Sequence, residues 1–328
     1  MPAASSTPPF VLAGDIGGTH ARLAIACRRD GRIAFERNGT FAVRDHAGLA
    51  EAIAAFLGDA PAPAHACIAW AGPIDGRCAR LTNGAWSVDA DWLQQRFGCA
   101  RVALVNDFHA AAAGVDDVGD DNLETLQPGR ANPAGARLVI GAGTGLGVAY
   151  ALRDAHGTRI VSGEGGHIAF APLDAEQDAL LAHLRPTLGR VTAEHLVSGS
   201  GIARLYTFCC AASGARPGTE VAREGAAAVA RRARDGEPPA VRALHLFCAI
   251  FGAVAGDHAL ACLATGGVYV AGGIAVRLAE RLADGAFTAA FRAKGVHTDL
   301  VARMPVWRVR DEGLGLRGAA LLALAGAA

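Results

Sequence analysis

Lysine and net charge are the scarcest features of this sequence. Lys294 is the only lysine among 328 residues, and the 31 Lys and Arg side chains are balanced by 31 Asp and Glu side chains. A chain without excess positive charge is not expected to attract nucleic acid or an anionic membrane surface. We therefore expect no nucleic-acid partner and no membrane partner.

A secretory signal, a clear membrane span and a cysteine framework are also missing. Residues 1–9 are small, polar and proline-containing, without the charged start and apolar core of a signal peptide. The longest apolar stretch, Leu244 to Ala264, is interrupted by Asp257 and His258, which favours a buried helix over a span. The eight cysteines form no CxxC pair and no zinc spacing, and most lie in apolar runs. These absences predict a cytoplasmic protein with reduced thiols rather than a disulfide framework.

Two common nucleotide-binding motifs are absent, but two similar glycine turns are present. No GxxxxGK[ST] element occurs, and the GxGxxG-like run within Gly141 to Gly147 opens a strand instead of a helix, which argues against a dinucleotide fold. Gly14 to Thr19 and Gly141 to Gly147 each lie between two short apolar strands. Successive glycines allow a tight turn and leave N–H groups pointing at an anion. The pair predicts two β-hairpins that grip a phosphate chain.

The order of the segments predicts two related α/β domains. Strand candidates come first and alternating helices and strands follow, which indicates mixed sheets. The polar stretch from Asp116 to Gly135 is typical of a connection between domains, and the plan restarts at Leu138. Such domains would enclose a ligand cleft that a hinge can close. The helices expected in the second half are Ala175–Arg185, Gly201–Ala212, Glu220–Asp235, Pro239–Leu263 and Gly313–Ala327.

Asp15 is an acid inside the first glycine turn. A carboxylate there would repel a phosphate unless a cation lies between them, and Mg²⁺ is held in this way by one carboxylate, nucleotide oxygens and water. The alternative is a turn aspartate bonded to its own backbone. The second glycine turn favours the metal role.

Asn106 and Asp107 follow directly on the short apolar strand Val102 to Val105. Ligands of open α/β sheets lie at such carboxyl ends of strands. Asp107 could accept a hydroxyl proton in phosphoryl transfer while Asn106 orients another hydroxyl. The alternative for Asp107 is an ordinary helix N-cap.

Three further polar residues come after the second hairpin. Glu164 and His167 lie three residues apart on a glycine-rich loop, and such a pair suits a polyhydroxylated ligand. Metal ligation is the rival, but no third or fourth ligand has suitable spacing. Glu194 is either another ligand contact or a solvated helix residue. Gly272 and Gly273 follow the late strand Val268 to Ala271, where they could receive a flat group or simply form a tight turn.

The chain resembles the bacterial glucokinases of the sugar kinase and actin-like ATPase superfamily. The resemblance runs from about Val11 to the last helix, and several motifs in a fixed order carry it. They are Gly14–Thr19, Thr82–Trp86, Asn106–Phe108, Gly141–Gly147, Gly163–His167, Ala193–Gly199 and Gly266–Gly273.

The resemblance implies an enzyme that transfers the γ-phosphoryl group of ATP to the 6-hydroxyl of D-glucose, as the entry step of glycolysis. It implies two actin-like (ribonuclease H-like) α/β domains with mixed sheets and an interdomain cleft: a smaller one over 1–115 and 313–328, and a larger one over 116–312. Asp107 would be the catalytic base, Asp15 the Mg²⁺-linked acid, and the protein a homodimer. The implied sugar contacts are Asn83, Asn106, Asp107, Glu164, His167 and Glu194. The implied nucleotide contacts are Gly14, Asp15, Gly17, Gly18, Thr19, Gly143, Thr144, Gly145, Gly272 and Gly273.

One position departs from the family pattern, because His20 stands where an asparagine usually follows the first turn. The cysteine-rich zinc motif and helix-turn-helix of the related repressor branch are absent, which disfavours a zinc-dependent or DNA-binding member. Two rivals stay open at this point: a kinase for another hexose or an amino sugar, and a catalytically idle sugar sensor. Intact Asp15 and Asp107 argue against the sensor.

Overall fold

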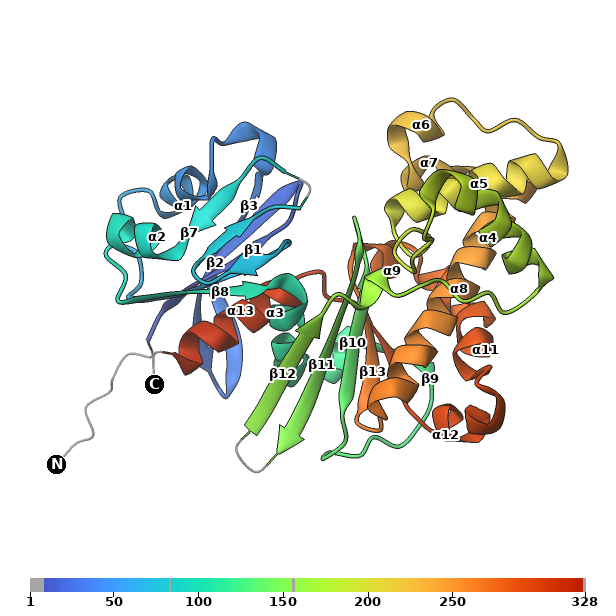
Figure 1. Cartoon of the computed structure of the whole chain (residues 1–328). Coiled ribbons are helices and arrows are strands. Elements are labelled where there is room, and N and C mark those ends of the chain that lie inside the picture. Colours follow the sequence, from blue (N-terminus) through green and yellow to red (C-terminus); the bar gives the residue numbers. More distant parts are fainter. Residues whose placement is uncertain (1–8, 83, 155–156, 327–328) are drawn as a thin grey trace. The chain divides into compact units, whose positions relative to one another are not determined.

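A computed structural model describes residues 9–82, 84–154 and 157–326. The chain forms two compact units (Figure 1): unit 1 is Met1–Asp120 with Gly313–Ala328, and unit 2 is Asp121–Glu312. The domain limits expected at 115 and 116 and at 312 and 313 stay predictions.

Unit 1 is built around a five-stranded sheet and a small three-stranded one. Its strands are β1 Val11–Ile16, β2 His20–Arg29, β3 Arg32–Ala42, β4 His65–Trp70, β5 Ile74–Asp75, β6 Cys78–Arg80, β7 Ser87–Asp89 and β8 Arg101–Asn106. Its helices are α1 Leu49–Leu57, α2 Ala90–Phe97, α3 Asp107–Gly114 and α13 Leu314–Ala325, with 3₁₀ turns at Val43–Asp45 and Val115–Asp117. A further 3₁₀ turn, Asp120–Asn122, contains the boundary between the two units. Asp89 caps α2, accepting hydrogen bonds from the backbone N–H groups of Asp91 and Trp92.

The main sheet of unit 1 has the strand order β3-β2-β1-β4-β8. β1 and β2 form an antiparallel hairpin, whereas β4 and β8 run parallel to β1. The parallel register places Asp15 beside Ala69 and Ala69 beside Val105. The last residues of β1, β4 and β8 therefore share one edge of the sheet.

Both faces of this sheet are covered, because alternate residues of each strand point to opposite sides. Leu12 and Ile68 belong to the core beneath α1 and α2, and Ala13 and Cys67 to the core beneath α13. The C-terminal helix α13, red in Figure 1, packs beside α3. Gly318 makes this approach possible, since a Cβ there would overlap the carbonyl oxygen of Ala110.

Unit 2 carries a six-stranded sheet and most of the helices. Its strands are β9 Leu123–Gln127, β10 Arg137–Ala142, β11 Leu146–Asp154, β12 Gly157–Gly163, β13 Gly267–Ala271 and β14 Val306–Val309. Its helices are α4 Ala175–Leu188, α5 Gly199–Ser213, α6 Val221–Glu224, α7 Ala226–Arg234, α8 Pro238–Cys262, α9 Gly273–Arg277, α10 Ala279–Ala283, α11 Ala286–Arg292 and α12 Thr298–Ala302, with 3₁₀ turns at Gly165–His167 and Gly295–His297.

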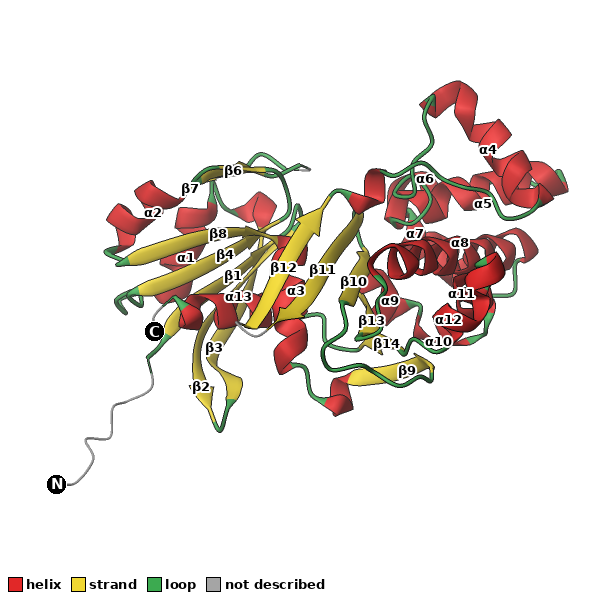
Figure 2. Ribbon diagram, turned by 60° about the horizontal axis from the view of Figure 1, so that its bottom comes forward, coloured by secondary structure: helices red, strands yellow, loops and turns green. Residues whose placement is uncertain are grey.

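The sheet of unit 2 repeats the plan of unit 1. Its order is β12-β11-β10-β13-β14-β9, with β10 and β11 as an antiparallel hairpin and β13 and β14 parallel to β10 (Figure 2). The predicted restart at Leu138 is confirmed, and so is the α/β fold with mixed sheets. The predicted connection from Asp116 to Gly135 is wrong in part, because β9 lies within it and pairs with β14.

Helix α8 forms the centre of unit 2. Its side chains Phe247 and Phe251 are fully buried and pack with Phe287 and Phe291 of α11. Among the described residues α8 is long and apolar enough to cross a membrane, but 72% of its most apolar window is buried within the protein. A buried core helix, as expected from Asp257 and His258, accounts for it.

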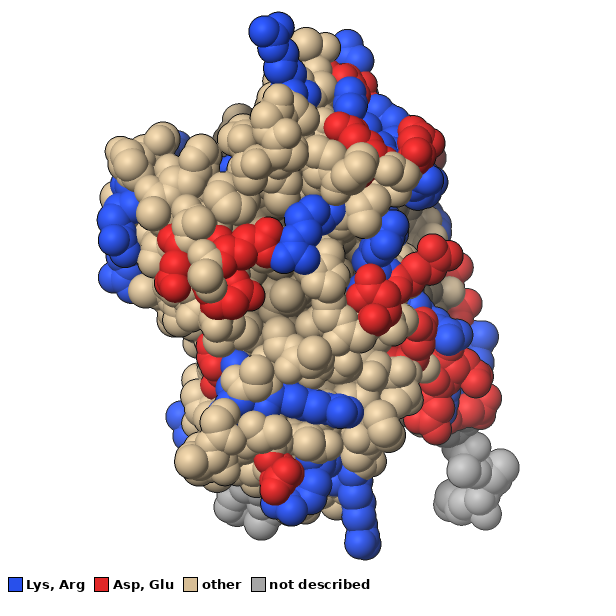
Figure 3. All heavy atoms as spheres, turned by 90° about the vertical axis from the view of Figure 1, so that its right-hand side faces the viewer, with Lys and Arg blue, Asp and Glu red and all other residues tan. Residues whose placement is uncertain are grey.

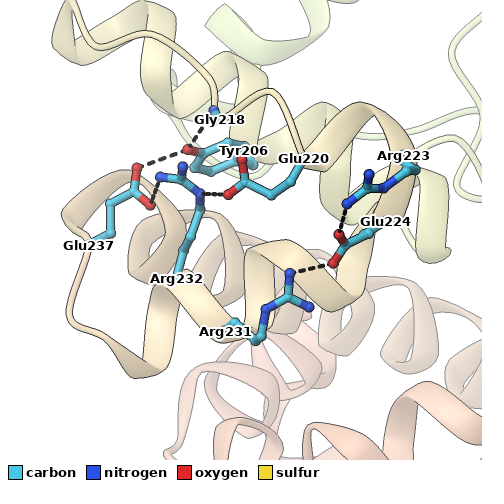
Figure 4. A network of polar contacts seen from close by, with 8 residues as sticks. All are labelled: Tyr206, Gly218, Glu220, Arg223, Glu224, Arg231, Arg232 and Glu237. Carbon is cyan, nitrogen blue, oxygen red and sulfur yellow. Dashed lines mark hydrogen bonds and ion pairs between the residues drawn. The ribbon is translucent and has the colours of Figure 1, made fainter.

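Polar contacts brace the helices of unit 2 (Figure 4). The guanidinium of Arg232 on α7 donates to Glu220 at 2.6 Å and to Glu237 at 2.7 Å, and Glu237 also accepts from the hydroxyl of Tyr206. The helix predicted over Glu220–Asp235 is broken at Gly225, which has φ +54°. On the face drawn in Figure 3, acidic and basic side chains lie interspersed, in keeping with a net charge of zero.

Candidate active site

The first glycine turn is shorter than the motif that contains it. β1 extends to Ile16 and β2 begins at His20, so that only Gly17, Gly18 and Thr19 form the tip. The N–H of Gly17 donates to the carbonyl of His20 at 2.9 Å. Gly14 is instead a buried strand residue, where a Cβ would lie 2.8 Å from Cδ1 of Ile68.

Asp15 lies at the end of β1 and is largely buried, with a side chain 17% exposed. A guanidinium nitrogen of Arg22 is 3.6 Å from its carboxylate, and a Cβ at Gly315 would lie 3.1 Å from its Cγ. The first turn of α13 therefore approaches the carboxylate closely. Burial raises the pKa of Asp15 more than Arg22 lowers it. A further cation at this carboxylate would offset the cost of its burial.

The chemistry of this donor suits one kind of metal site. Among the described residues, no group of three or more His, Cys, Asp or Glu side chains could hold a metal alone. Mg²⁺ differs from zinc in this respect, since it commonly takes one or two carboxylates and completes its ligands with water and phosphate oxygens. Asp15 fits Mg²⁺ delivered with a nucleotide.

The second glycine turn is tied to Glu194. Its tip is Gly143, Thr144 and Gly145, and the N–H of Gly143 donates to the carbonyl of Gly145 at 2.8 Å. Oε2 of Glu194 accepts from the N–H of Leu146 at 2.9 Å. A Cβ on Gly145 would overlap the same carboxylate. Thr144 is exposed at the tip.

Asn106, and not Asp107, is the N-cap of α3. Oδ1 of Asn106 accepts from the N–H groups of Phe108, at 2.9 Å, and His109, at 3.2 Å. Asp107 is the first helical residue, and its Oδ1 also accepts from the N–H of Phe108 at 2.9 Å. The capping role considered for Asp107 thus belongs to its neighbour. Asp107 therefore lies in the first turn of α3, at the end of the helix that carries partial positive charge.

Glu164 and His167 are exposed and face each other. Nε2 of His167 lies 3.8 Å from Oε2 of Glu164. The side chain of His167 is 57% exposed and that of Glu164 is 79% exposed. The N–H of Glu194 donates to the carbonyl of Gly166 at 2.9 Å, which joins the Glu194 segment to this loop. The structure therefore brings Glu164, His167 and Glu194 together with the second glycine turn.

Gly272 and Gly273 lie at the same sheet edge as the second turn. β13 runs parallel to β10 with Ala271 beside Gly141. Gly272 has φ +90°, and a Cβ there would lie 2.7 Å from the carbonyl oxygen of Ala142. Both observations require glycine for local reasons of packing and backbone conformation. Asn83 lies outside the described residues.

Two residues near this cluster were not predicted as part of the site. The hydroxyl of Tyr150 on β11 is 2.7 Å from Nδ1 of His258 on α8. The ring of His258 lies against Gly165, between Glu164 and Gly166. The available signal was a histidine within the most apolar part of the chain. The sequence alone could not pair it with a partner 108 residues away.

Known proteins resemble this chain over nearly its whole length. A family model described as Glucokinase matches residues 12–325. The glucokinase of Hahella chejuensis is 38% identical over 318 residues, covering 96% of this chain and 97% of that protein. The crystal structure of a glucokinase from an Antarctic psychrotroph has a TM-score of 0.86 at 32% identity, covering 97% of this chain and 99% of that one. A Balamuthia mandrillaris glucokinase solved in complex with glucose shares the fold, with a TM-score of 0.80 at 23% identity over 98% of this chain and 95% of that one. The chain therefore belongs to the glucokinase family, whose members are ATP-dependent kinases of glucose.

Proposed function

We propose that Asp107 is the general base of the glucokinase reaction. Its carboxylate would take the proton of the 6-hydroxyl as that oxygen attacks the γ-phosphoryl group of ATP, and ADP would leave. The observation that carries the proposal is that Asn106 and Asp107 have different roles at the start of α3. Oδ1 of Asn106 caps α3, and Oδ1 of Asp107 also accepts from the N–H of Phe108. The carboxylate of Asp107 is therefore not needed as the helix cap.

The sugar contacts that we propose are Glu164, His167, Glu194 and Asn106. Carboxylates accept from pairs of hydroxyls, and an imidazole can donate or accept. Because Oδ1 of Asn106 already accepts two backbone hydrogen bonds, its side-chain NH₂ is the group left for a sugar hydroxyl. Oε2 of Glu194 is engaged by Leu146, so Oε1 is the oxygen that would meet the sugar. Asn83 stays a predicted contact.

The nucleotide contacts that we propose are the two glycine turns and Gly272 with Gly273. The N–H groups of Gly17 and Gly143 already donate within their own turns. The phosphates would therefore meet the N–H groups of Gly18, Thr19, Thr144 and Gly145 and the two threonine hydroxyls. Gly14 would act indirectly, since it lets β1 pack against Ile68. Gly272 and Gly273 would leave room for the adenosine part of ATP.

Asp15 would hold the Mg²⁺ that accompanies ATP. Its burial and raised pKa support this role, because a bound cation stabilises the ionised form. When bound, Mg²⁺ would neutralise charge on the phosphates.

We also propose that the enzyme is a cytoplasmic homodimer. All eight cysteines are free, which is expected in a reducing compartment. The dimer rests on the family resemblance alone, and light scattering coupled to size-exclusion chromatography tests it.

Replacement of Asp107 by alanine tests the general base. We expect kcat to fall at least ~100-fold, the usual contribution of general-base catalysis, while glucose still binds in calorimetry. Asp59→Asn, an exposed position of the same unit, is the matched control and should keep normal kcat. Near-normal turnover of Asp107→Ala would refute the assignment.

Replacement of Glu164 by glutamine tests the sugar site. The loss of a charged acceptor costs about 1.5–3 kcal/mol, so we expect the KM for glucose to rise at least ~10-fold with little change for ATP. A sugar panel in a coupled ADP assay would show reduced discrimination. An unchanged KM for glucose would exclude Glu164 as a contact.

A further inference from the structure

Tyr150 and His258 form a polar pair beneath the proposed sugar loop, in which His258 is buried and Tyr150 is partly buried. The hydroxyl of Tyr150 and Nδ1 of His258 are 2.7 Å apart, and His258 is only 6% exposed. The other ring nitrogen, Nε2, is also buried, and the backbone of Gly165 is the further polar group beside the ring. Ala255 and Ala259, which are close to His258 along α8, are apolar and buried. The tyrosine hydroxyl thus gives this histidine a directional partner in an apolar core.

The imidazole fills the space beside Gly165 that a side chain would need. A Cβ on Gly165 would lie 2.8 Å from Cε1 of His258 and 2.9 Å from Cβ of Val148. Gly165 therefore rests directly on the histidine ring and on β11. Glu164 precedes Gly165, and Gly166 follows it and accepts from the N–H of Glu194. A shift of the ring would move the backbone between Glu164 and His167.

We propose that Tyr150 and His258 are positioning residues for glucose binding. Their contact holds the imidazole against Gly165 and thereby fixes the positions of the Glu164 and His167 side chains. The inference rests on the proposed sugar contacts of Glu164 and His167. Neither positioning residue touches the substrate. A histidine in this place costs desolvation, as its lowered pKa indicates, with Asp257 and the Gly165 backbone opposing that effect. A hydrogen-bonded ring fixes an orientation that apolar packing would leave free.

Tyr150→Phe is the main test, because it removes one hydroxyl and leaves the ring. We expect the glucose KM and the calorimetric glucose Kd to rise about five- to tenfold, the effect of one buried hydrogen bond left unmade. The KM for ATP should stay within about twofold, since the phosphate turns are unchanged. His258→Leu should act in the same direction. His245→Leu, an exposed histidine of the same helix, should leave both KM values unchanged.

His258→Asn separates positioning from a general loss of stability. Its side-chain amide can replace Nδ1 as a partner of Tyr150, so the glucose KM should recover at least in part relative to His258→Leu. Thermal unfolding of each variant is measured alongside. If Tyr150→Phe and His258→Leu lower the melting temperature but leave the glucose KM unchanged, or raise both KM values equally, the pair is merely structural and the inference is overturned.

Glu164→Gln is run in the same series to keep the two proposals apart. If Glu164→Gln raises the glucose KM and Tyr150→Phe does not, only the positioning role fails. If Glu164→Gln has no effect on glucose, the proposed sugar contact fails and the positioning inference falls with it.

Discussion

The contact between Gly145 and Glu194 makes Gly145→Ala the most informative single substitution. A Cβ at this position would overlap Oε2 of Glu194 and lie 3.0 Å from its Cδ. The carboxylate must therefore move, and its 2.9 Å hydrogen bond from the N–H of Leu146 must break or bend. One methyl group thus disturbs a proposed phosphate turn and a proposed sugar contact together.

The expected magnitude follows from the bond that is lost. A hydrogen bond to a charged group contributes about 1.5–3 kcal/mol, and each 1.4 kcal/mol is a factor of about ten. We therefore expect kcat/KM to fall ~10- to 100-fold for glucose. Because we propose that the same turn binds phosphate, we expect kcat/KM to fall for ATP as well. The change should be reproduced in part by Glu194→Gln, whose amide is a weaker acceptor.

Gly143→Ala provides the comparison within the same turn. A Cβ at Gly143 meets no atom of the described residues within 4 Å, so it adds bulk at the tip without moving Glu194. We expect Gly143→Ala to raise the KM for ATP and to leave the KM for glucose unchanged. Steady-state kinetics with each substrate varied in turn would measure both values. If Gly145→Ala also spares glucose, Glu194 does not couple the turn to the sugar.

Three further predictions concern stability. Gly318→Ala should lower the free energy of unfolding by about 1–3 kcal/mol in urea titration, because the added methyl overpacks the contact of α13 with Ala110. Gly163→Ala, with open space around the added methyl, should lower the free energy of unfolding by less than about 0.5 kcal/mol. Arg232→Met should lower the melting temperature more than Arg223→Met, since Arg232 contacts two carboxylates and Arg223 only one (Figure 4). Equal effects would show that the two ion pairs of Arg232 add no stability beyond that of one exposed pair. Burial lowers the pKa of His258 from 6.5, so the stability contributed by the neutral His258 ring is fully present above pH 6.5 and is lost as the pH falls through the folded-state pKa. His258→Asn should therefore reduce the slope of the free energy of unfolding against pH below pH 6.5, by up to about 1.4 kcal/mol per pH unit. An unchanged slope would contradict this prediction.

Much of the architecture could be predicted because many elements have a local signal. The helix after Asp89 begins at a capping side chain, and the two glycine turns are flanked by short apolar strands. The repeated hairpin was visible because both turns use the same residue types. β9 could not be predicted in this way, since Leu123–Gln127 is mostly polar and becomes a strand only by pairing with β14. Its register depends on a partner far along the chain.

The candidate site could be predicted only in its types of residue. Asp107 and Glu164 were selected by chemistry and position, but which of Asn106 and Asp107 caps α3 depends on backbone angles that sequence does not give. Gly14 and Gly145 look alike in the motifs. The first serves packing against Ile68 and the second makes room for Glu194. Such differences arise from long-range contacts.

The return of α13 to the first unit has a consequence for biosynthesis. Unit 2 is one continuous segment, Asp121–Glu312, whereas unit 1 needs Gly313–Ala328 to complete its second core. During translation, unit 2 is therefore completely synthesised before unit 1 is complete. Until α13 is made, the sheet of unit 1 leaves Ala13 and Cys67 uncovered. Until the ribosome releases α13, this uncovered face of the sheet is the part of the nascent protein that a chaperone would have to shield.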